Sequence, residues 1–558
     1  MIEGGAMRAR QVFLESLLAH DVNYIFGNPG STENAVVDGM FEYPELSYIL
    51  ALHEGVAVGA ATFYAQASGR TPLVNLHAGP GLGNAIGMIY GGLRANVPMI
   101  VSAGQQDTRM RLLEPILGHD LAAMAAPVVK WSMQIEHADE VSLAVRRAHK
   151  IANEAPKGPV FLSMPLNVME DETEAGPEGP GVIHRAPAAH AAGIEQAAAF
   201  LSKAAHPVIV AGDGVAQDGA DGAVGRLAEI TGAEIWFEPS RARYPVAADH
   251  LAVRGSLPFD SVGMRAIFDE ADAILLVGGR FFEELWYNAD TSPLSGIKAD
   301  VVQIDDAEAR LARFHPIDLG LIGDIEATVT ALCDSLADGL DGKYRAAAEQ
   351  RLARIAPHRE QRAERQRARA GEPGETGKVS VPHAMAAMRD ELPADTAFVA
   401  EVITTRPDFD GTFDYLGIND YFGGRGGGIG QGIAGAIGVK LAYPERPVVA
   451  VCGDGSAMYS IQALWTAAHH DLAIVFIIFS NREYRILKRN LDEWRRRFSI
   501  NSNAPNPLLD IAEPPLDFVA LAKGMGVDGA YVNEDHGVAP AVRQALDAGR
   551  PFLIEMEV

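Results

Sequence analysis

Short apolar runs alternate with amphipathic helical patterns along most of the chain, and polar or glycine-rich turns follow the runs. Runs of this kind are typical of strands that are buried on both faces of a parallel sheet. The repeated alternation predicts an α/β protein with three domains, each a parallel sheet flanked by helices. We expect an N-terminal domain at 1–180, a central domain at 193–340, a helix and linker at 341–378, and a C-terminal domain at 379–558.

The apolar runs also give the individual strands. In the N-terminal domain we expect strands at 24–26, 48–52, 73–76 and 99–102. The central domain should contain strands at 207–211, 234–237, 273–278 and 301–304, and the C-terminal domain at 397–400, 421–422, 448–451, 474–479 and 552–555. Residues 169–190 have the composition of a linker, and 345–377 indicates a solvated charged helix followed by a flexible connector.

Polar residues follow four expected strands of the N-terminal domain. Ser31, Glu54, His77 and Gln105 all come just after a strand end. Because parallel strands end at the same edge of a sheet, we expect these side chains along one edge, where open α/β sheets bind ligands. Ser31 or Thr32 should also cap the helix that follows.

The most specific motif is a strand, helix and strand over 448–484. Gly453-Asp454-Gly455-Ser456 follows the first strand, and Asn481 follows the second. Asp454 and Asn481 offer hard oxygen ligands, which suit Mg²⁺ bound together with phosphate oxygens. The two glycines allow close approach of a phosphate, and Ser456 is the expected helix N-cap. A second Gly-Asp-Gly, at 212–214, has Ser240 at the equivalent downstream position, so we interpret it as an ordinary turn.

Composition and net charge limit the classes of binding partner and the cellular compartment that we expect for this protein. The formal net charge is −26 with a pI near 5.0, which disfavours a general nucleic-acid binder. The two cysteines, Cys333 and Cys452, give neither a disulfide framework nor a zinc spacing. No apolar run approaches the ~20 residues that cross a bilayer. We therefore expect a cytoplasmic protein with no membrane partner.

The motif resembles the diphosphate and metal motif of the thiamine-diphosphate-dependent enzymes, and the chain is most similar among them to the benzoylformate decarboxylases. The similarity extends with gaps over nearly the whole chain and includes FGNPGS, YILALHE, YAQAS, NLH, AGQQ, KWS, GDGSAMYSIQALWTAA and FVALAKGMGV. The resemblance implies pyrimidine-binding, central Rossmann-like and pyrophosphate-binding domains in that order. It also implies thiamine diphosphate and Mg²⁺ as cofactors, a 2-oxo acid substrate, and a homotetramer built as a dimer of dimers, with active sites shared between two subunits.

The resemblance also implies roles for single residues. Asp454, Asn481 and the carbonyl of Glu483 match the metal ligands. The residues that match cofactor contacts are Glu54, Thr404, Gly427, Ile429, Gly453, Gly455, Ser456, Asn481 and Tyr484. Among these, Glu54 matches the glutamate at the aminopyrimidine N1′, Ile429 the bulky residue under the bent cofactor, and Gly427 the carbonyl facing the 4′-amino group. Ser31 matches a contact to the substrate carboxylate, and His77 an acid/base histidine.

Glu54 has a physical reason to be catalytic. A carboxylate at N1′ favours the imino tautomer, whose nitrogen can take the weakly acidic thiazolium proton. An apolar surround rich in glycine and alanine would favour the protonated carboxyl in this role. Simpler alternatives remain: Glu54 as a helix N-terminal carboxylate, His77 as a loop histidine and Ser31 as a cap. We leave His119 structural, and we interpret the glycine-rich 423–432 as a tight wrap around the cofactor rather than a dinucleotide loop.

Two departures from the family bear on the substrate. A second active-site histidine of the benzoylformate decarboxylases aligns here with Leu285, which cannot relay a proton. After Tyr484 the family has apolar pocket residues, whereas this chain has Arg485 and Lys488. These cations indicate either a solvated helix face or a site for an anionic substrate tail, with Arg406, Arg425 and Arg482 as further candidates. Ile116 and Leu117 match apolar pocket positions.

Three functional hypotheses follow. The first is non-oxidative decarboxylation of a benzoylformate-like or anionic-tailed 2-oxo acid to an aldehyde, with carboligase activity as an additional expectation. The second is a lyase or synthase of the acetolactate synthase, 2-hydroxyacyl-CoA lyase or oxalyl-CoA decarboxylase kind. The third is a catalytically silent cofactor-binding protein, which the presence of Glu54 disfavours.

Overall fold

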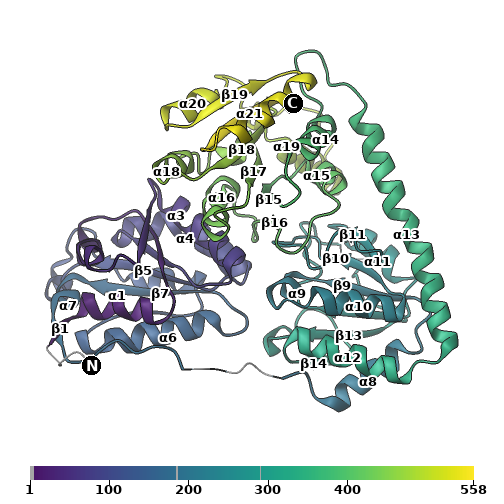
Figure 1. Cartoon of the computed structure of the whole chain (residues 1–558), viewed down its shortest axis with the longest axis horizontal. Helices are drawn as coiled ribbons and strands as arrows, with labels where there is room; N and C mark the ends of the chain where they lie inside the picture. The colour runs from purple at the N-terminus through teal and green to yellow at the C-terminus, as the bar shows by residue number, and fades with distance from the viewer. Residues whose placement is uncertain (1–5, 182, 184–186, 289–290) are drawn as a thin grey trace. The chain divides into compact units, whose positions relative to one another are not determined.

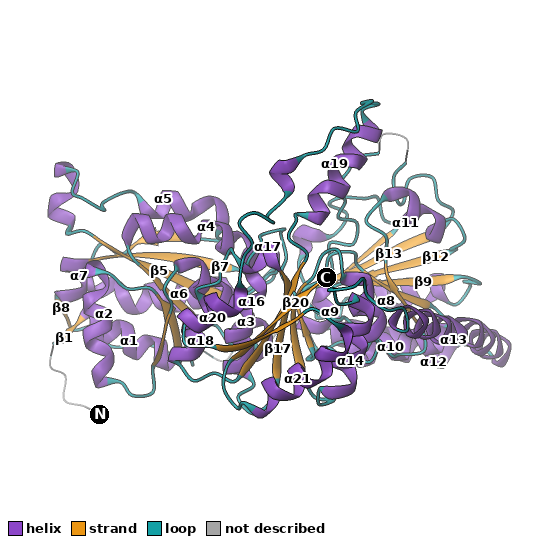
Figure 2. Cartoon of the chain, turned by 90° about the horizontal axis from the view of Figure 1, so that it is seen from above, coloured by secondary structure: helices purple, strands orange, loops and turns teal. Residues whose placement is uncertain are grey.

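The computed structural model describes residues 6–181, 183, 187–288 and 291–558. Within these residues it contains three six-stranded sheets and one two-stranded sheet. Helices flank each large sheet, as the helix and strand colours of Figure 2 show. The predicted α/β fold with three parallel-sheet domains is confirmed.

The N-terminal sheet has the order β3-β2-β4-β5-β7-β6, with every pairing parallel. Figure 1 labels its strands β5 and β7. Its strands are β2 (Tyr24–Gly27), β3 (Ser47–Leu50), β4 (Leu73–Leu76), β5 (Met99–Gln105), β6 (Ser132–Gln134) and β7 (Pro159–Pro165). The helices of this domain are α1 (Ala9–Ala19), α2 (Asn34–Gly39), α3 (Glu54–Ser68), α4 (Ala78–Arg94), α5 (Leu121–Ala125), α6 (Val141–Asn153) and α7 (Leu166–Glu170). A small antiparallel pair, β1 (Met7–Arg8) with β8 (Glu172–Thr173), joins the two ends of the domain.

The pleat of this sheet explains its two hydrophobic cores. Successive strand residues point to opposite faces, so neighbours in sequence enter different cores. Ile25, Leu73 and Ile100 join the core formed with α1 and α6. The residues that follow them, Phe26, Val74 and Val101, join the core formed with α3 and α4. Both faces are therefore apolar, which is why the strands read as continuous runs.

The central sheet has the order β11-β10-β9-β12-β13-β14 and is parallel. Its strands are β9 (Pro207–Ala211), β10 (Glu234–Phe237), β11 (Val253–Ser256), β12 (Ala273–Val277), β13 (Asp300–Asp305) and β14 (Leu319–Ile322). The helices are α8 (Ala191–Leu201), α9 (Asp213–Gln217), α10 (Asp221–Thr231), α11 (Ser261–Phe268), α12 (Ile325–Gly339) and α13 (Gly342–Ala370). The predicted charged segment at 345–377 is thus mostly the long helix α13.

The second Gly-Asp-Gly does more than turn the chain. It joins β9 to α9, and the buried Asp213 accepts backbone N–H groups of Ala242 at 2.9 Å and Arg243 at 3.1 Å. Asp213 therefore holds the loop after the neighbouring strand β10, and its carboxylate is occupied by the protein itself.

The C-terminal sheet has the order β16-β15-β17-β18-β20-β19. Its strands are β15 (Ala397–Glu401), β16 (Tyr421–Phe422), β17 (Val448–Gly453), β18 (Ile474–Ser480), β19 (Asp528–Val532) and β20 (Phe552–Glu557). The helices are α14 (Val381–Glu391), α15 (Arg406–Thr412), α16 (Gln431–Ala442), α17 (Asp454–Ala457), α18 (Ala463–His469), α19 (Arg485–Arg497), α20 (Phe518–Gly524) and α21 (Val538–Asp547).

The described residues form two compact units. One contains the N-terminal and C-terminal sheets, and the other contains the central sheet, α13 and residues 410–421. Inside the first unit, α3 packs on α16 through small residues. A Cβ added at Gly435 would lie 2.6 Å from the Phe63 ring, and one at Gly59 would lie 2.8 Å from Ala434. The small residues of both helices thus permit a close helix contact that joins the two sheets in one core.

Candidate active site

The carboxyl edge of the N-terminal sheet carries Ser31 and His77. Ser31 is exposed and begins the short helical turn Ser31–Glu33, for which Gly30 is the N-cap residue. The prediction that Ser31 or Thr32 caps the next helix is wrong, because Glu33 occupies the N-cap position of α2. His77 is the N-cap residue of α4 and its side chain is 24% exposed, so one part of the ring reaches solvent.

Glu54 is a buried carboxylate at the start of α3. Asn28 donates its amide N–H to Oε1 at 3.2 Å, and Asn84 donates to Oε2 at 3.0 Å. A Cβ added at Gly81 would lie 3.2 Å from Oε1. The expected apolar surround is therefore only partly right, since two amide donors orient the carboxylate. Asn28 and Asn84 are not among the predicted site residues, although Asn28 lies within the FGNPGS run.

The metal motif lies at the carboxyl edge of the C-terminal sheet, as predicted, but its local geometry differs. Helix α17 begins at Asp454 with Gly453 as N-cap residue, so Ser456 lies inside the helix and the prediction of Ser456 as N-cap is wrong. The Asp454 carboxylate itself accepts the N–H of Gly455 at 2.7 Å. A carboxylate that already lies at the helix start takes the place that a serine would occupy.

Asp454 and Asn481 come together because β17 and β18 are adjacent parallel strands. Asp454 Oδ2 accepts the backbone N–H of Arg482 at 2.6 Å, and Asn481 Oδ1 accepts that of Glu483 at 3.0 Å. Burial raises the pKa of Asp454, while the N–H groups of Arg482, Gly455 and Asn481 act in the opposite direction. The structure thus places the Asp454 carboxylate beside the turn that contains Asn481, at neighbouring strand ends.

The chemistry of these donors fits a hard cation with outside ligands. Among the described residues there is no cluster of three or more histidine, cysteine or acidic side chains that could hold a metal alone. A site built from Asp454, Asn481 and the Glu483 carbonyl would therefore need ligand oxygens, as Mg²⁺ bound to a phosphate group does. A Cβ added at Gly453 would meet no atom within 4 Å, whereas one at Gly455 would lie 2.7 Å from the Tyr484 ring. The space beside Gly453 is open to a ligand, and the absence of a side chain at Gly455 lets the Tyr484 ring pack close to the backbone. These residues therefore fit a diphosphate group and a metal ion.

The glycine-rich loop that contains Gly427 and Ile429 is fastened to the same edge. Glu401, at the end of β15, accepts the N–H groups of Gly430 at 2.8 Å and Gly432 at 3.0 Å. Ser460, just beyond α17, donates its hydroxyl to the Gly430 carbonyl at 2.7 Å. Gly427 has a positive φ of 73°, a conformation that favours glycine. Thr404 follows β15 at this edge and is half-buried.

Within one chain, helix α4 extends from the surroundings of Glu54 to those of the glycine-rich loop. Its first turns contact Glu54 through Gly81 and Asn84, and its Gly91 lies against Gln431 next to the glycine-rich loop. Ten residues separate Gly81 from Gly91, and at 1.5 Å rise per residue that is roughly 15 Å.

Two basic side chains after Tyr484, Arg485 and Lys488, are paired with acids. Arg485 pairs with Glu483 at 2.7 Å, and Lys488 pairs with both Glu483 and Asp510. Partial burial raises the pKa of Glu483, but hydrogen bonds from Arg485 and Lys488 outweigh this and lower it. Helix α19 contains no buried residue. The geometry favours a solvated, internally neutralised face over a free cationic site.

The other predicted pocket residues are divided between the two compact units. Leu285 belongs to the unit with the central sheet and is 63% exposed. Ile116 is 83% exposed and Leu117 is half-buried with φ 69°. Arg425 is buried and Arg482 pairs with Glu557 at 2.7 Å, while Arg406 begins α15. The substrate roles of these residues stay predictions.

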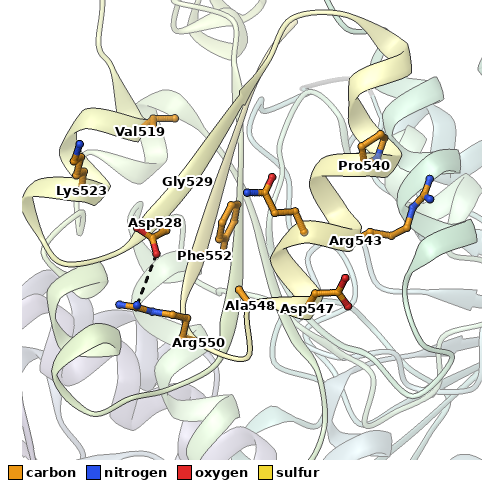
Figure 3. A pocket seen from close by; sticks show the side chains of 11 residues that line it. Val519, Lys523, Asp528, Gly529, Pro540, Arg543, Asp547, Ala548, Arg550 and Phe552 are labelled. Atoms are coloured by element: carbon orange, nitrogen blue, oxygen red, sulfur yellow. Dashed lines mark ion pairs between the residues drawn. The ribbon is translucent and has the colours of Figure 1, made fainter.

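Two cavities differ in their position relative to the predicted site residues. A cavity of about 580 Å³ adjoins the carboxyl end of β5, and most of the residues that line it are of polar types, including Gln105, Thr108 and His119. Another cavity, of about 1010 Å³, lies at the amino ends of β19 and β20, where Asp528 pairs with Arg550 at 3.8 Å (Figure 3). The cavity of about 1010 Å³ is at the edge opposite to the metal motif, and none of the predicted site residues lines it.

Comparison with known proteins agrees with this geometry. Family models of the thiamine pyrophosphate enzymes match the N-terminal TPP binding domain at 7–126, the central domain at 194–332 and the C-terminal TPP binding domain at 413–556. Benzoylformate decarboxylase of Pseudomonas aeruginosa is 34% identical over 550 residues, 97% of each chain. The chain belongs to the thiamine pyrophosphate-dependent enzymes.

Other members of this family show how far the similarity reaches. A solved thiamine diphosphate-dependent 4-hydroxybenzoylformate decarboxylase of Rhodococcus jostii RHA1 superposes with a TM-score of 0.84 at 29% identity, covering 99% of both chains. The acetolactate synthase isozyme 2 large subunit of Escherichia coli is 24% identical over 99% of this chain and 96% of its own. This thiamine pyrophosphate-dependent enzyme is therefore related to decarboxylases and to synthases. No helix among its described residues has the length and apolar character needed to cross a membrane.

Proposed function

We propose that this enzyme decarboxylates an aromatic or otherwise neutral-tailed 2-oxo acid to the aldehyde, using thiamine diphosphate and Mg²⁺. The observation that carries the proposal is the buried, doubly hydrogen-bonded Glu54 in a chain that also presents the Asp454 and Asn481 pair. When bound, thiamine diphosphate supplies the electron sink for loss of CO₂.

The residues of this chain have separable tasks. Asp454, Asn481 and the Glu483 carbonyl would hold the metal, while Gly453, Gly455, Ser456 and Thr404 would face the diphosphate. Glu54 would share a proton with a ring nitrogen of the cofactor, and Asn28 and Asn84 keep its two oxygens in place. His77 gives and takes a proton at the substrate, and Ser31 contacts the substrate carboxylate.

The ion pairs after Tyr484 support a substrate whose tail carries no charge. Arg485 and Lys488 are already neutralised by Glu483 and Asp510, so they have little charge to offer an anionic tail. The similarity to two aryl 2-oxo acid decarboxylases points in the same direction. We also propose a homotetramer in which two subunits complete each active site, and carboligation of aldehydes as an accompanying activity.

A panel of 2-oxo acids with added Mg²⁺ and thiamine diphosphate tests the proposal. We expect CO₂ and aldehyde from benzoylformate and its ring-substituted relatives, with slower release from dicarboxylic and CoA-linked 2-oxo acids. Glu54→Gln serves as the matched inactive control. If no 2-oxo acid in the panel gives CO₂, the proposed reaction is wrong.

A synthase is the second candidate, because the chain is similar to acetolactate synthases over nearly its full length. The two activities differ in what happens after CO₂ loss. A synthase should form a new carbon–carbon bond with a second 2-oxo acid as its main product, whereas a decarboxylase should release aldehyde in amounts equal to CO₂.

A further inference from the structure

A fully buried carboxylate lies directly behind His77. The Glu33 side chain is 0% exposed, and its Oε2 lies 2.9 Å from His77 Nδ1. Glu33 comes from the turn that follows β2, whereas His77 follows β4. The contact therefore exists only because the two strands are adjacent and parallel.

Glu33 accepts hydrogen bonds from four directions. Oε2 takes the backbone N–H of Gly30 at 2.8 Å as well as the His77 ring, and Oε1 takes the N–H of Gly104 at 2.9 Å. The Thr32 hydroxyl donates to Oε1 at 2.7 Å. An ionised carboxylate has two acceptor sites on each oxygen, so it satisfies all four donors at once. Four donors also compensate for burial of the negative charge.

This arrangement decides which ring nitrogen of His77 carries the hydrogen. The Thr32 hydroxyl is 3.1 Å from Nδ1, but its proton is used on Glu33, so it can only accept from the ring. Nδ1 therefore faces two acceptors, Glu33 Oε2 and Thr32 Oγ1. A neutral imidazole with hydrogen on Nδ1 meets both, and its Nε2 is left with a free lone pair.

Two glycines make room for the pair. A Cβ at Gly30 would overlap the His77 ring, and a Cβ at Gly104 would overlap Glu33 Oε1. Gly30 has φ −130°, an extended conformation open to any residue, so space rather than backbone freedom requires glycine there. Because Gly30 precedes Ser31, the same carboxylate also fixes the backbone that presents Ser31 relative to His77.

We propose that Glu33 is a positioning residue that holds His77 as the Nδ1–H tautomer, so that Nε2 is the atom that exchanges a proton with the substrate. The inference rests on the proposed function of His77 in decarboxylation. Glu33 itself does not touch substrate, since its side chain is fully buried. It would also stabilise the imidazolium each time Nε2 takes up a proton.

The tautomer can be measured without any turnover. In the full-length protein labelled with ¹⁵N-histidine, long-range ¹H–¹⁵N correlation distinguishes Nδ1–H from Nε2–H. The chain has 16 histidines, so the signal of His77 is identified by its loss in His77→Ala. We expect Nδ1–H in the wild type and a shift toward Nε2–H in Glu33→Gln. A wild-type His77 in the Nε2–H form would overturn the proposal, and this result would not depend on whether a substrate has been found.

Kinetics test the role with a double-mutant cycle. With a substrate found as above, Glu33→Gln should lower kcat by on the order of 10²–10⁴-fold with little change in KM, as expected when the orienting carboxylate of a catalytic histidine is lost. In the His77→Ala background the same change should alter kcat by less than about threefold. A loss of equal size in both backgrounds would mean that Glu33 acts through the fold and not through His77.

Thr32→Val is the matched control. It removes the hydrogen bond of the Thr32 hydroxyl to Glu33 Oε1 and the 3.1 Å contact of that hydroxyl with His77 Nδ1, but it keeps the Glu33 carboxylate as the acceptor for Nδ1–H, so kcat should fall by no more than about tenfold. Thermal unfolding of each variant checks that the domain remains folded. If Thr32→Val and Glu33→Gln lowered kcat equally, the assignment to the tautomer would be lost.

Discussion

Gly30 lies against the face of the His77 ring, closely enough that a single added methyl group would overlap it. Strand β2 delivers Gly30 and strand β4 delivers His77, so neither is near the other in sequence. The position of the acid/base candidate is thus set by a residue without a side chain. This relation leads to a direct test.

We predict that Gly30→Ala displaces the His77 ring and lowers kcat by at least ~10-fold, since a small misplacement of a catalytic group costs this much or more. The backbone should tolerate alanine at φ −130°. We therefore expect a clear loss of kcat with only a small change in melting temperature. Steady-state kinetics beside thermal unfolding measures both. Gly87→Ala, where an added Cβ meets no atom within 4 Å, is the matched control.

Glu54→Gln should slow the exchange of the thiazolium C2 proton by on the order of 10²–10⁴-fold, the range of general acid–base catalysis. The amide keeps the shape of the side chain but cannot take up the proton. Exchange into D₂O, followed by NMR after acid quench, measures this step without a substrate. Exchange at the wild-type rate would remove Glu54 from the mechanism.

The metal motif predicts a cofactor affinity that depends on Mg²⁺. Asp454→Asn and Asn481→Leu should each weaken thiamine diphosphate binding by at least ~10–100-fold, because losing a ligand should cost no less than losing a residue that only supports one. Chelation of Mg²⁺ from the wild type should have the same effect. Titration calorimetry with and without Mg²⁺ would detect it. Asp213→Asn, in the other Gly-Asp-Gly, should leave cofactor affinity unchanged.

Arg485→Ala and Lys488→Ala should change KM for benzoylformate by less than about threefold. Both cations are partly exposed and already paired with acids, and such pairs contribute little. A comparison of KM for neutral-tailed and dicarboxylic 2-oxo acids in both variants would check this. A large rise in KM confined to the dicarboxylic acids would revive the anionic-tail hypothesis.

Glu401 should make the stability of the protein depend on pH. Burial raises the pKa of Glu401 to about 7 from its ordinary 4.5, even though the N–H groups of Gly432, Gly430 and Gln431 favour the ionised form. A folded state with the higher pKa binds the proton more tightly, so this stabilisation is complete below the ordinary value and is lost as pH rises through about 7.

The difference in unfolding free energy between wild type and Glu401→Gln should therefore shrink as pH rises from about 4.5 to about 7. Chemical denaturation at several pH values in this interval provides the measurement. Parallel curves for the two proteins would show that Glu401 keeps its ordinary titration in the fold. The variant matters for function as well, because Glu401 fastens the loop that contains Gly427 and Ile429.

The fold class and the candidate residue types could be predicted from the residue pattern alone. Strands buried on both faces read as continuous apolar runs, so β2, β4, β9 and β17 were predicted within two residues of their observed ends. Strands β6, β11, β14 and β19 were missed because half-buried or exposed residues interrupt their runs. The fully buried β7 was missed despite its apolar run.

How those residues are capped and paired depends on contacts that the residue pattern does not show. Helix starts depend on backbone geometry. Helix α17 therefore begins at Asp454 and not after Ser456, and Gly30 instead of Ser31 is the N-cap residue of the turn. The same holds for partners, since Glu33 meets His77 and Asp510 meets Lys488 across long stretches of sequence. A sequence pattern records which chemistry is present, whereas parallel strand order decides which side chains end at the same edge and neutralise or orient one another.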